Sequence, residues 1–549
     1  MGGNGELAER FIASLEARDW DAWAGLLDPA VVYEIPQSRE RIRGRDRYLR
    51  FNQEYPGDWH LRPKVTIADE RHAVVWFEWL LDGRTDDAMA FFEFGGGLIT
   101  RVTDFWPEPY EPPPGREHLT ERWLPARAAA TRRPAIRAST KQSEADMDTR
   151  PVYTLSSRPA VIESRNEAIE RARALRDRLR ERLPLGQELR RLPDENVADL
   201  LESGLFGVMK PRHYGGSELG TQTMIDVTIE LASADPSTGW VYMLWTAHMW
   251  LQALWPKQAM DEMWENPNAL ASSVVSTAGN VEKVEGGYRW TGRGFFSSGV
   301  DHCNWLTALV PTFKDGERLD MRWLLLPRED LEIVDDWHTI GLRGTGSKTI
   351  ILNDVFIPEY RTLPVLNIGN GDSPGREVNT HPMYGGPSDA NFTGAMSVPA
   401  IGAAKGLIEM FHQRLGSKIE IPDDTNSPYL PEGMAITMGR LSQAAATVDA
   451  ARALMLVNAQ SFAERPAKEV TLADSLRMKR DTAWCAQRAR RAINVLYEES
   501  GGSALSEKAP LQQFWRDTNA AAAHRGLMFD WQAEGWVKAV LGLPVPLPS

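Results

Sequence analysis

The chain has 549 residues and a formal net charge of −13, and 42% of its residues are hydrophobic. This length exceeds what a single hydrophobic core supports, so we expect two or more domains. The acidic balance argues against nucleic acid as a partner, because phosphate binding needs a concentrated basic surface. No apolar run is long enough to cross a membrane and residues 1–10 lack a signal-peptide core, so the expected location is the cytoplasm.

The two cysteines, Cys303 and Cys485, are too few for a disulfide framework and lack the spacing of a metal site. We therefore expect two buried or partly buried thiols and no bound metal. The 20 tryptophans suit a protein with aromatic-lined cavities, although packing in a core explains such residues equally well.

The first domain, residues 1–110, is predicted to begin with helices and to continue as a run of strands. Apolar side chains recur at helical spacing from Leu7 to Leu26. Short stretches rich in β-branched and aromatic residues follow, separated by turn signals such as Asp82-Gly83. The predicted strands are residues 31–35, 64–68, 72–81, 87–94 and 98–105, with a short helix at 45–51. Helices followed by strands indicate an α+β cone.

Four stretches of this domain carry a family pattern: DWDAW at 19–23, YEIP at 33–36, RGR at 43–45 and ITRVTDFW at 99–106. They resemble the SnoaL-type family of nuclear-transport-factor-2-like domains (NTF2-like domains). The resemblance implies a cone around a cavity that Tyr33, His60, Asp104 and Trp106 line. Two roles stay open for this domain. One is binding of a hydrophobic ligand, with acid–base chemistry on polyketide intermediates in some relatives, and the other is docking or assembly.

Residues 111–150 are predicted to be a linker. They include a run of three prolines, an alanine–arginine stretch that holds the basic run 122–137, and a polar patch. Such a composition cannot bury a core. We interpret the basic run as part of a solvated connector rather than as a binding surface.

The remainder, residues 151–549, is predicted to form helices, then strands, then helices again. Helical periodicity covers residues 160–182, 185–205 and 221–254, and strand-like patterns cover 281–290, 305–310, 322–327 and 348–355. Long helices return at 401–415, 432–464, 472–499 and 511–541. We divide this part into an N-terminal helical domain (151–268), a central β-barrel-like domain (269–375) and a C-terminal four-helix bundle (376–549).

Four motifs occur in order along this part: PRHYGG at 211–216, WTGR through SSG at 290–299, GLRGTGS at 341–347 followed by NDVFIP at 353–358, and FWRD at 514–517. Together they resemble the acyl-CoA dehydrogenase superfamily over the whole of residues 151–549. A dehydrogenase of this type needs a carboxylate base, which the superfamily carries shortly after the last motif. His524 stands at about that place, so the base is absent.

The stretch from Ser298 to Trp305 is similar instead to the two-component flavin-dependent monooxygenases of this superfamily, of the p-hydroxyphenylacetate hydroxylase type. The resemblance implies an oxygenase component in which a flavin C4a-hydroperoxide hydroxylates a phenolic or polycyclic aromatic substrate, polyketides included. It implies reduced FMN as the cofactor, with FAD as the alternative, O2 as co-substrate, a separate NAD(P)H-dependent flavin reductase and a homotetramer. The motif GLRGTGS leads into a strand rather than a helix, so it is no dinucleotide fingerprint, which fits a separate reductase.

Carried over by position, the resemblance implies a catalytic role for three residues. His248 matches a histidine over the aromatic substrate, Ser298 a hydroxyl near flavin N5, and His524 a histidine beside the reacting oxygen. Substrate contacts are implied for His248 and for two further residues, Trp245 and Ser273. The neighbouring Ser272 and Ser276 compete with Ser273 for this match.

Cofactor contacts are implied for Ser298, Gly299, Thr345, Gly346 and Ser347. The catalytic assignments each have a structural alternative: His248 as a hydrogen-bonded core histidine, Ser298 as a turn residue, and His524 as a position in an alanine-rich helix without local need for an imidazole. Two other functions also remain open. They are an acyl-CoA dehydrogenase-like oxidoreductase and a non-catalytic protein that binds hydrophobic ligands.

Overall fold

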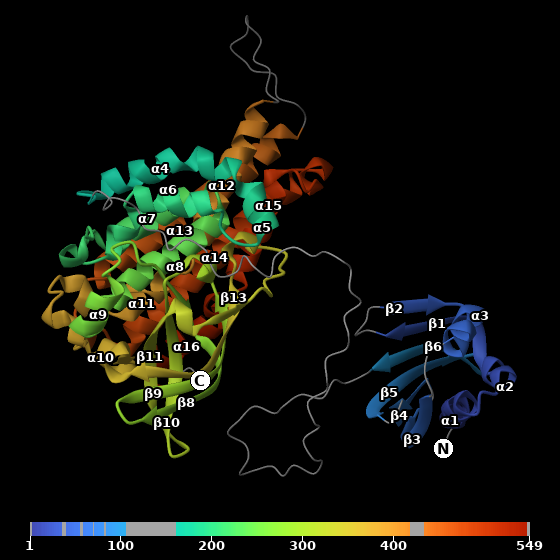
Figure 1. Cartoon of the computed structure of the whole chain (residues 1–549). Helices are drawn as coiled ribbons and strands as arrows, with labels where there is room; N and C mark the ends of the chain where they lie inside the picture. Colours follow the sequence, from blue (N-terminus) through green and yellow to red (C-terminus); the bar gives the residue numbers. More distant parts are fainter. Residues whose placement is uncertain are drawn as a thin grey trace, which may run out of the picture. The chain divides into compact units, whose positions relative to one another are not determined.

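The computed structural model describes residues 3–105 and 161–545, apart from residues 36–39, 55–58, 70, 82–83 and 418–432. The chain divides into two compact units, residues 1–140 and 141–549 (Figure 1). The predicted linker at 111–150 and the predicted cavity residue Trp106 lie outside the described residues. Within the described ranges, no helix combines the length and apolar character that a membrane span requires.

The first unit is an α+β domain, as predicted. Its helices are α1 (Gly3–Glu16), α2 (Trp20–Ala24) and α3 (Arg45–Gln53). Its strands are β1 (Leu27–Ile35), β2 (Glu40–Arg43), β3 (Trp59–Ala68), β4 (His72–Leu81), β5 (Arg84–Gly95) and β6 (Leu98–Phe105). They form one sheet in the order β2-β1-β6-β5-β4-β3, in which only the β1–β6 pair is parallel. Figure 1 shows the three helices on one face of this sheet.

The inner face of this sheet follows from the alternation of side chains along a strand. Ala73, Val75 and Phe77 of β4 are buried at every second position. They pack toward the helices, where Trp23 is fully buried and lies 5.1 Å from Phe11, measured between ring centroids. The sequence did not predict β2, a short edge strand of mostly charged residues.

The cavity predicted for this unit lies between the helices and the inner face of the sheet. Tyr33 and Asp104 line it, as predicted. The prediction for His60 is wrong, because this residue is exposed and lies outside the cavity. Its neighbours Trp59 and Leu61 line the cavity instead, as the alternation along β3 requires.

The second unit begins with helices and continues with strands. The helices are α4 (Arg165–Glu181), α5 (Leu183–Leu189), α6 (Asp194–Glu202), α7 (Gly220–Ala232), α8 (Pro236–Gln252) and α9 (Lys257–Met263). The strands are β7 (Ala271–Val274), β8 (Ser276–Val284), β9 (Gly287–Ser297), β10 (Trp305–Lys314), β11 (Glu317–Pro327), β12 (Glu332–Val334), β13 (Lys348–Pro358) and β14 (Thr362–Pro364). The sheet runs β12-β13-β9-β8-β10-β11-β14, and β7 pairs with β10.

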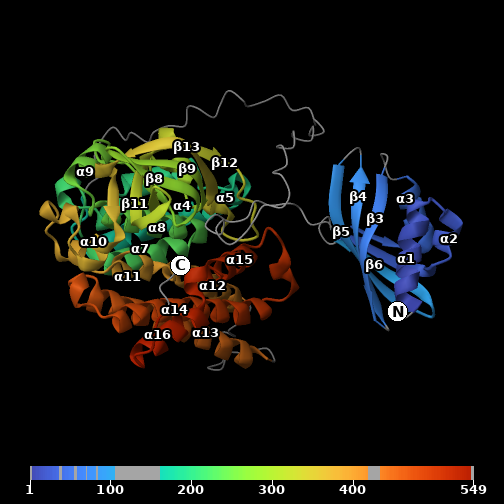
Figure 2. The same cartoon turned by 90° about the horizontal axis from the view of Figure 1, so that it is seen from below.

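Helices return after the sheet. They are α10 (Val365–Asn370), α11 (Ser388–Asn391), α12 (Val398–Gly416), α13 (Met434–Phe462), α14 (Leu472–Glu498), α15 (Pro510–Ala522) and α16 (Phe529–Val540). Figure 2 shows α7 and α8 between the strands and the orange and red helices of the C-terminal part. This order of helices, strands and helices confirms the predicted fold class. Both cysteines are buried, as predicted.

Three long helices that the sequence predicted are broken in the structure. Residues 185–205 break at Arg190, which adopts a left-handed φ of 54°, and at Pro193. Residues 221–254 break where Asp235 accepts a hydrogen bond from the backbone N–H of Ser237 and Pro236 starts a new helix. Residues 511–541 break after α15, so His524 does not lie inside a helix. Periodicity continued across each break because the apolar face resumes on the next helix.

The second unit packs around α8. Every residue of α8 except Leu244 is buried, which is the pattern of a helix surrounded by protein on all sides. Close contact with α7 and α12 requires glycine. A Cβ on Gly239 of α8 would lie 2.4 Å from the Cβ of Ala232, and one on Gly402 of α12 would lie 2.6 Å from the same atom. The packing therefore holds α8 tightly between the N-terminal and C-terminal helices.

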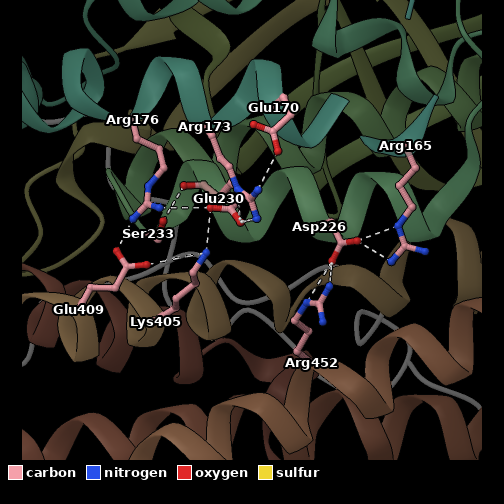
Figure 3. Close-up of polar contacts among 10 residues, drawn as sticks. All are labelled: Arg165, Glu170, Arg173, Arg176, Asp226, Glu230, Ser233, Lys405, Glu409 and Arg452. Carbon is pink, nitrogen blue, oxygen red and sulfur yellow. Dashed lines mark hydrogen bonds and ion pairs between the residues drawn. The ribbon is translucent and has the colours of Figure 1, made fainter. Parts of the chain in front are cut away.

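Buried carboxylates of α7 form ion pairs with residues of α4, α12 and α13 (Figure 3). Asp226 lies 2.5 Å from Arg165 of α4 and 2.7 Å from Arg452 of α13. Glu230 contacts arginines of α4 and lies 2.8 Å from Lys405 of α12. Burial by itself would raise the pKa of Glu230, but the surrounding cations hold that pKa below its ordinary value. Glu230 therefore stays charged. Through their ion pairs, the two carboxylates tie four helices together.

Substitution of Asp226 tests this connection. Asp226→Asn leaves two arginines without their shared carboxylate, and we expect a loss of roughly 2 kcal/mol in the free energy of unfolding of this unit. Glu170→Gln is the matched control, because Glu170 makes only an exposed pair with Arg173 on the same helix. Thermal unfolding of both variants measures the difference. Equal melting temperatures would contradict the structural role of Asp226.

Candidate active site

His248 of α8 is a buried histidine with one ring nitrogen in use. Its Nδ1 lies 2.7 Å from the carbonyl oxygen of Ala271 at the start of β7. A carbonyl only accepts, so Nδ1 carries the hydrogen and Nε2 is an acceptor. Nε2 is buried and has no partner within the described part of the chain. Burial lowers the pKa of His248 to about 4, so the ring is neutral at ordinary pH.

The imidazole of His248 faces an aromatic side chain that the sequence did not single out. Phe392 lies 5.5 Å from it between ring centroids, and Trp323 lies 5.6 Å from Phe392 in an edge-on arrangement. An acceptor nitrogen beside aromatic surface suits a ring-shaped ligand with a hydroxyl group. The buried ring and the hydrogen bond of Nδ1 also fit the alternative of a hydrogen-bonded core histidine. The unused Nε2 is the feature that a ligand would explain.

The serines of β7 separate into one with hydrogen-bond partners and one without. The hydroxyl of Ser272 is 2.8 Å from the hydroxyl of Ser297 and donates to the carbonyl oxygen of Ser298, also at 2.8 Å. Ser273 is half-buried, on the opposite face of the strand, and its side chain makes no hydrogen bond among the described residues. Ser276 is exposed. Of the three competing serines, Ser273 is the half-buried one whose hydroxyl is not used within the protein. It lies on β7, the strand whose Ala271 carbonyl accepts from His248.

Ser298 belongs to a buried chain of hydroxyl groups. Trp240 of α8 donates from Nε1 to the Ser298 hydroxyl at 3.3 Å. That hydroxyl lies 2.7 Å from Ser347, which lies 2.7 Å from Thr345. Thr345 donates its single hydroxyl hydrogen to the carbonyl oxygen of Leu342 at 2.8 Å. Ser298, Thr345 and Ser347 are three of the predicted cofactor contacts, and the structure brings all three together.

The carbonyl at the end of this chain fixes the direction of every hydrogen bond. Because Thr345 donates its only hydroxyl hydrogen to the Leu342 carbonyl oxygen, Ser347 must donate to Thr345, and Ser298 must donate to Ser347. Ser298 accepts from Trp240 with one lone pair and keeps a second lone pair. Toward any further ligand, Ser298 is therefore an acceptor and not a donor.

The Leu342 peptide is held from the C-terminal helices. Leu342 has a left-handed φ of 52°, and its N–H donates to the Asp517 carboxylate of α15 at 2.6 Å. Its carbonyl also accepts from the indole of Trp337 at 3.0 Å. Asp517 is fully buried, and burial raises its pKa to about 7, with a further increase from nearby Asp235. Asp517 thus connects the FWRD motif with the loop that orients the hydroxyl chain.

Two glycines predicted to contact the cofactor shape the turns around the chain. Gly299 has φ of 72° and donates its N–H to the carbonyl oxygen of Thr345 at 2.8 Å. A Cβ on Gly299 would lie 2.5 Å from the indole of Trp245, which is fully buried. Gly346 also adopts a left-handed φ, of 53°. The structure places Trp245 against this turn, where it supports the position of Ser298.

His524 lies in the connection between α15 and α16, which corrects its placement in a continuous helix. Its Nδ1 accepts a hydrogen bond from the backbone N–H of Gly526 at 3.1 Å. In the neutral ring Nε2 therefore carries the hydrogen, the reverse of His248. Burial lowers the pKa of His524. The ring centroid lies 6.1 Å from Trp240, so this tryptophan connects His524 with Ser298.

Trp240 and Arg343 lie next to predicted site residues, and the sequence did not single them out. Trp240 is one of 20 tryptophans, and nothing local distinguished it from a core side chain. Arg343 stands inside the GLRGTGS motif, two residues before Thr345. Its Nε is buried and has no acceptor among the residues that the structure describes. Arg343 as a whole is half-buried. Its unused Nε is a donor that a ligand acceptor could meet.

Comparison with protein families divides the chain in the same way. The acyl-CoA dehydrogenase N-terminal domain family matches residues 166–262, and the acyl-CoA dehydrogenase C-terminal domain family matches residues 395–529. The SnoaL-like domain family matches residues 8–102.

Known proteins similar to the second unit are hydroxylases. A pigment production hydroxylase of Rhodococcus sp. is 32% identical over 386 residues, which cover 70% of this chain and 99% of the relative. HsaA of Rhodococcus jostii, the oxygenase subunit of a flavin-dependent monooxygenase, is 34% identical over 65% of this chain and 93% of its own. The structure of XiaF from Streptomyces sp. in complex with FADH2 and glycerol matches with a TM-score of 0.64 and 26% identity, covering 70% of this chain and 97% of XiaF.

The raised pKa of Asp517 predicts a dependence of stability on pH. The folded protein holds this proton with a pKa of about 7, against an ordinary value of 3.8. The contribution of the proton to stability is therefore complete below pH 3.8 and is lost as the pH rises through 7. Asp517→Asn removes the titration and keeps an oxygen that accepts from Leu342. We compare the free energy of unfolding of this variant with that of the wild type by thermal unfolding. From about pH 5 to about pH 8, we expect the difference to shift in favour of the variant by a few kcal/mol. A difference that does not vary with pH would refute the buried titration.

Proposed function

The chain belongs to the oxygenase components of two-component flavin-dependent monooxygenases on the acyl-CoA dehydrogenase fold, and from this membership we propose that it hydroxylates a phenolic or polycyclic aromatic substrate. It is an enzyme that uses reduced flavin and O2, and a separate flavin reductase supplies the reduced flavin. The dehydrogenase alternative lacks its carboxylate, since His524 stands in its place. The observation that carries the proposal is the hydroxyl chain that ends at Ser298.

The residues around Ser298 fit a flavin. The row of hydroxyl groups offers a buried acceptor at Ser298. Arg343 offers a half-buried cation whose buried Nε has no partner among the described residues. A reduced flavin has a hydrogen on N5, where the oxidised form has a lone pair. An acceptor with fixed direction therefore suits the reduced form. When bound, reduced flavin supplies the electrons that activate O2 for transfer of one oxygen atom to an aromatic ring. Reduced FMN is the proposed cofactor, and FAD meets the same requirements.

The two histidines offer different hydrogen-bonding groups, one an acceptor and the other a donor. His248 has an acceptor nitrogen, which we assign to the hydroxyl group of the substrate, where it accepts a hydrogen bond and makes the ring more electron-rich. Ser273 supplies a second polar contact from β7. His524 has a donor nitrogen, which we assign to the oxygen that is transferred. Gly299 and Gly346 shape the turns beside Ser298 and stay proposed cofactor contacts. Trp245 stays a proposed substrate contact.

Association of several copies is part of the proposal. Helix α16 has no buried residue, and it exposes apolar side chains that include Trp531 at 54% and Val540 at 58%. Exposed apolar side chains of this kind indicate a contact surface, which supports the proposed homotetramer.

The cytoplasm remains the proposed location, because the reductase draws on NAD(P)H. Fusion to a SnoaL-like domain favours an aromatic polyketide as the substrate.

Hydroxylation itself is tested with the whole chain, chemically reduced FMN and a set of phenols and naphthols under air. We expect a hydroxylated product from at least one compound and oxygen consumption that follows product formation. Reduced FMN that is oxidised at the rate found without protein, with no product from any compound, would overturn the proposal. The same assay with FAD identifies the preferred flavin.

The separate roles of the histidines predict different defects. His524→Ala removes a donor beside the transferred oxygen, so we expect most of the consumed oxygen to appear as hydrogen peroxide while substrate affinity changes little. His248→Ala removes the acceptor for the substrate hydroxyl, so we expect substrate affinity to fall roughly tenfold. Peroxide release and substrate titration measure the two effects. Identical defects in both variants would contradict the division of roles.

The proposed association predicts a change of size. Val540→Asp places a charge on the apolar surface of α16, and we expect the assembly to dissociate to smaller species in light scattering. Glu534→Gln on the same helix is the control and keeps the wild-type mass. A wild-type protein that is monomeric at micromolar concentration would contradict the proposed homotetramer.

A further inference from the structure

Gln252 of α8 carries a buried amide group to which the fold gives no hydrogen bond. The residue is 1% exposed, and neither its Oε1 nor its Nε2 has a partner within the described part of the chain. Burial without partners costs free energy, because water no longer reaches the donor and the acceptor of the amide. Leucine and methionine have helix propensities similar to that of glutamine, so the helix does not require an amide here. A ligand group that hydrogen-bonds to the amide would account for it.

Gln252 lies on the same face of α8 as His248. The two residues are four positions apart, which places them about 40° apart around the helix and about 6 Å apart along its axis. Val241 and Trp245 belong to the same face, and a Cβ on Gly299 would lie 2.8 Å from the first and 2.5 Å from the second. His248 contacts β7. This face is therefore directed at the strands of the second unit, and Gln252 follows His248 on the side away from Gly299.

Aromatic surface lies beside this face of α8. Trp323 and Leu325 of β11 pack with the helices, whereas Leu324 between them packs in the core of the strands. Since side chains alternate along a strand, the Trp323 face of β11 is directed at the helices. Trp323 contacts Phe392, which in turn lies against His248. A ring held against Phe392 therefore meets one acceptor nitrogen, and the unused amide lies one helical turn farther along α8.

We propose that Gln252 recognises a second hydroxyl group of the aromatic substrate, an inference that rests on the proposed function. A hydroxyl group suits an amide, because it can donate to Oε1 or accept from Nε2 in either orientation of the side chain. A carboxylate does not suit it, because an amide has no charge to balance a buried anion. His248 accepts from the first hydroxyl group, and the aromatic ring spans the turn of α8 between the two residues.

This arrangement defines a class of substrate. It is a neutral aromatic diol whose hydroxyl groups are about 6 Å apart, the rise of four residues along a helix. Hydroxyl groups at opposite positions of one ring, or at positions 1 and 5 of naphthalene, have this separation. Gln252 is then a specificity-determining residue, and its contact lies on the side of the substrate that is remote from Gly299 and Ser298.

Binding of naphthols to the whole chain with reduced FMN under nitrogen tests this role. Oxygen transfer cannot occur without O2, so equilibrium dialysis measures binding alone. The probes are 1,5-dihydroxynaphthalene, 1-naphthol, which lacks the second hydroxyl group, and 1,8-dihydroxynaphthalene, whose two hydroxyl groups are adjacent. We expect the wild type to bind the 1,5-diol about tenfold more tightly than either of the other compounds, the effect of one additional hydrogen bond to a buried group.

Two variants of α8 connect this preference with Gln252. Gln252→Met keeps the length of the side chain and removes the amide, so we expect its affinity for the 1,5-diol to fall to its affinity for 1-naphthol. Thr246→Val is the matched control, because Thr246 is also buried but lies two positions before His248, on the other side of the helix. It keeps the preference. A ratio of two affinities within one protein does not depend on the fraction that is folded, so partial unfolding cannot imitate the result.

The outcomes separate this inference from the proposed function. Equal affinity of the wild type for the 1,5-diol and 1-naphthol would overturn the inference and leave the proposed hydroxylation in place. A preference for the 1,5-diol that persists in Gln252→Met would do the same. If the wild type binds none of the three compounds, both the inference and the role proposed for His248 are overturned.

Discussion

The active site depends on one peptide group, that of Leu342. Its N–H is fixed by Asp517 of the last helices, and its carbonyl oxygen receives the hydroxyl hydrogen of Thr345. Because a carbonyl cannot donate, this single contact sets the direction of each hydrogen bond as far as Ser298. Leu342 adopts a left-handed φ of 52°, which costs free energy in a non-glycine residue. A motif of the C-terminal bundle thus determines what a serine of the β-domain offers to a flavin.

Helix α8 supplies the second constraint, because it is buried on all sides. It carries Trp240 toward Ser298 and His524, and it carries His248 to the carbonyl of Ala271. The two histidines have opposite arrangements of hydrogen, set in each case by one backbone contact of Nδ1. In the proposed function, the same residue type thereby supplies an acceptor for the substrate hydroxyl group and a donor for the transferred oxygen.

Much of this could be predicted from the sequence, and the failures have physical reasons. Strand patterns and the order of elements gave the fold class, and motif positions gave Ser298, Thr345 and Ser347. Helix ends were missed where an apolar face continues across a break, as at Pro236 and His524. Trp240, Phe392 and the role of Asp517 could not be found, because their importance comes from contacts between residues far apart in the chain. His60 was assigned to the wrong face of its strand.

The most direct measurement is the affinity of the whole chain for oxidised and for reduced FMN, determined anaerobically in the wild type and in Thr345→Val. The account predicts that reduced FMN binds more tightly, because Ser298 can only accept. Thr345→Val is expected to reduce the preference for reduced FMN, because the hydrogen bonds between Ser298 and Ser347 can then reverse their direction. The control Thr312→Val on β10 is expected to leave the preference unchanged. Equal or tighter binding of oxidised FMN by the wild type would contradict the account.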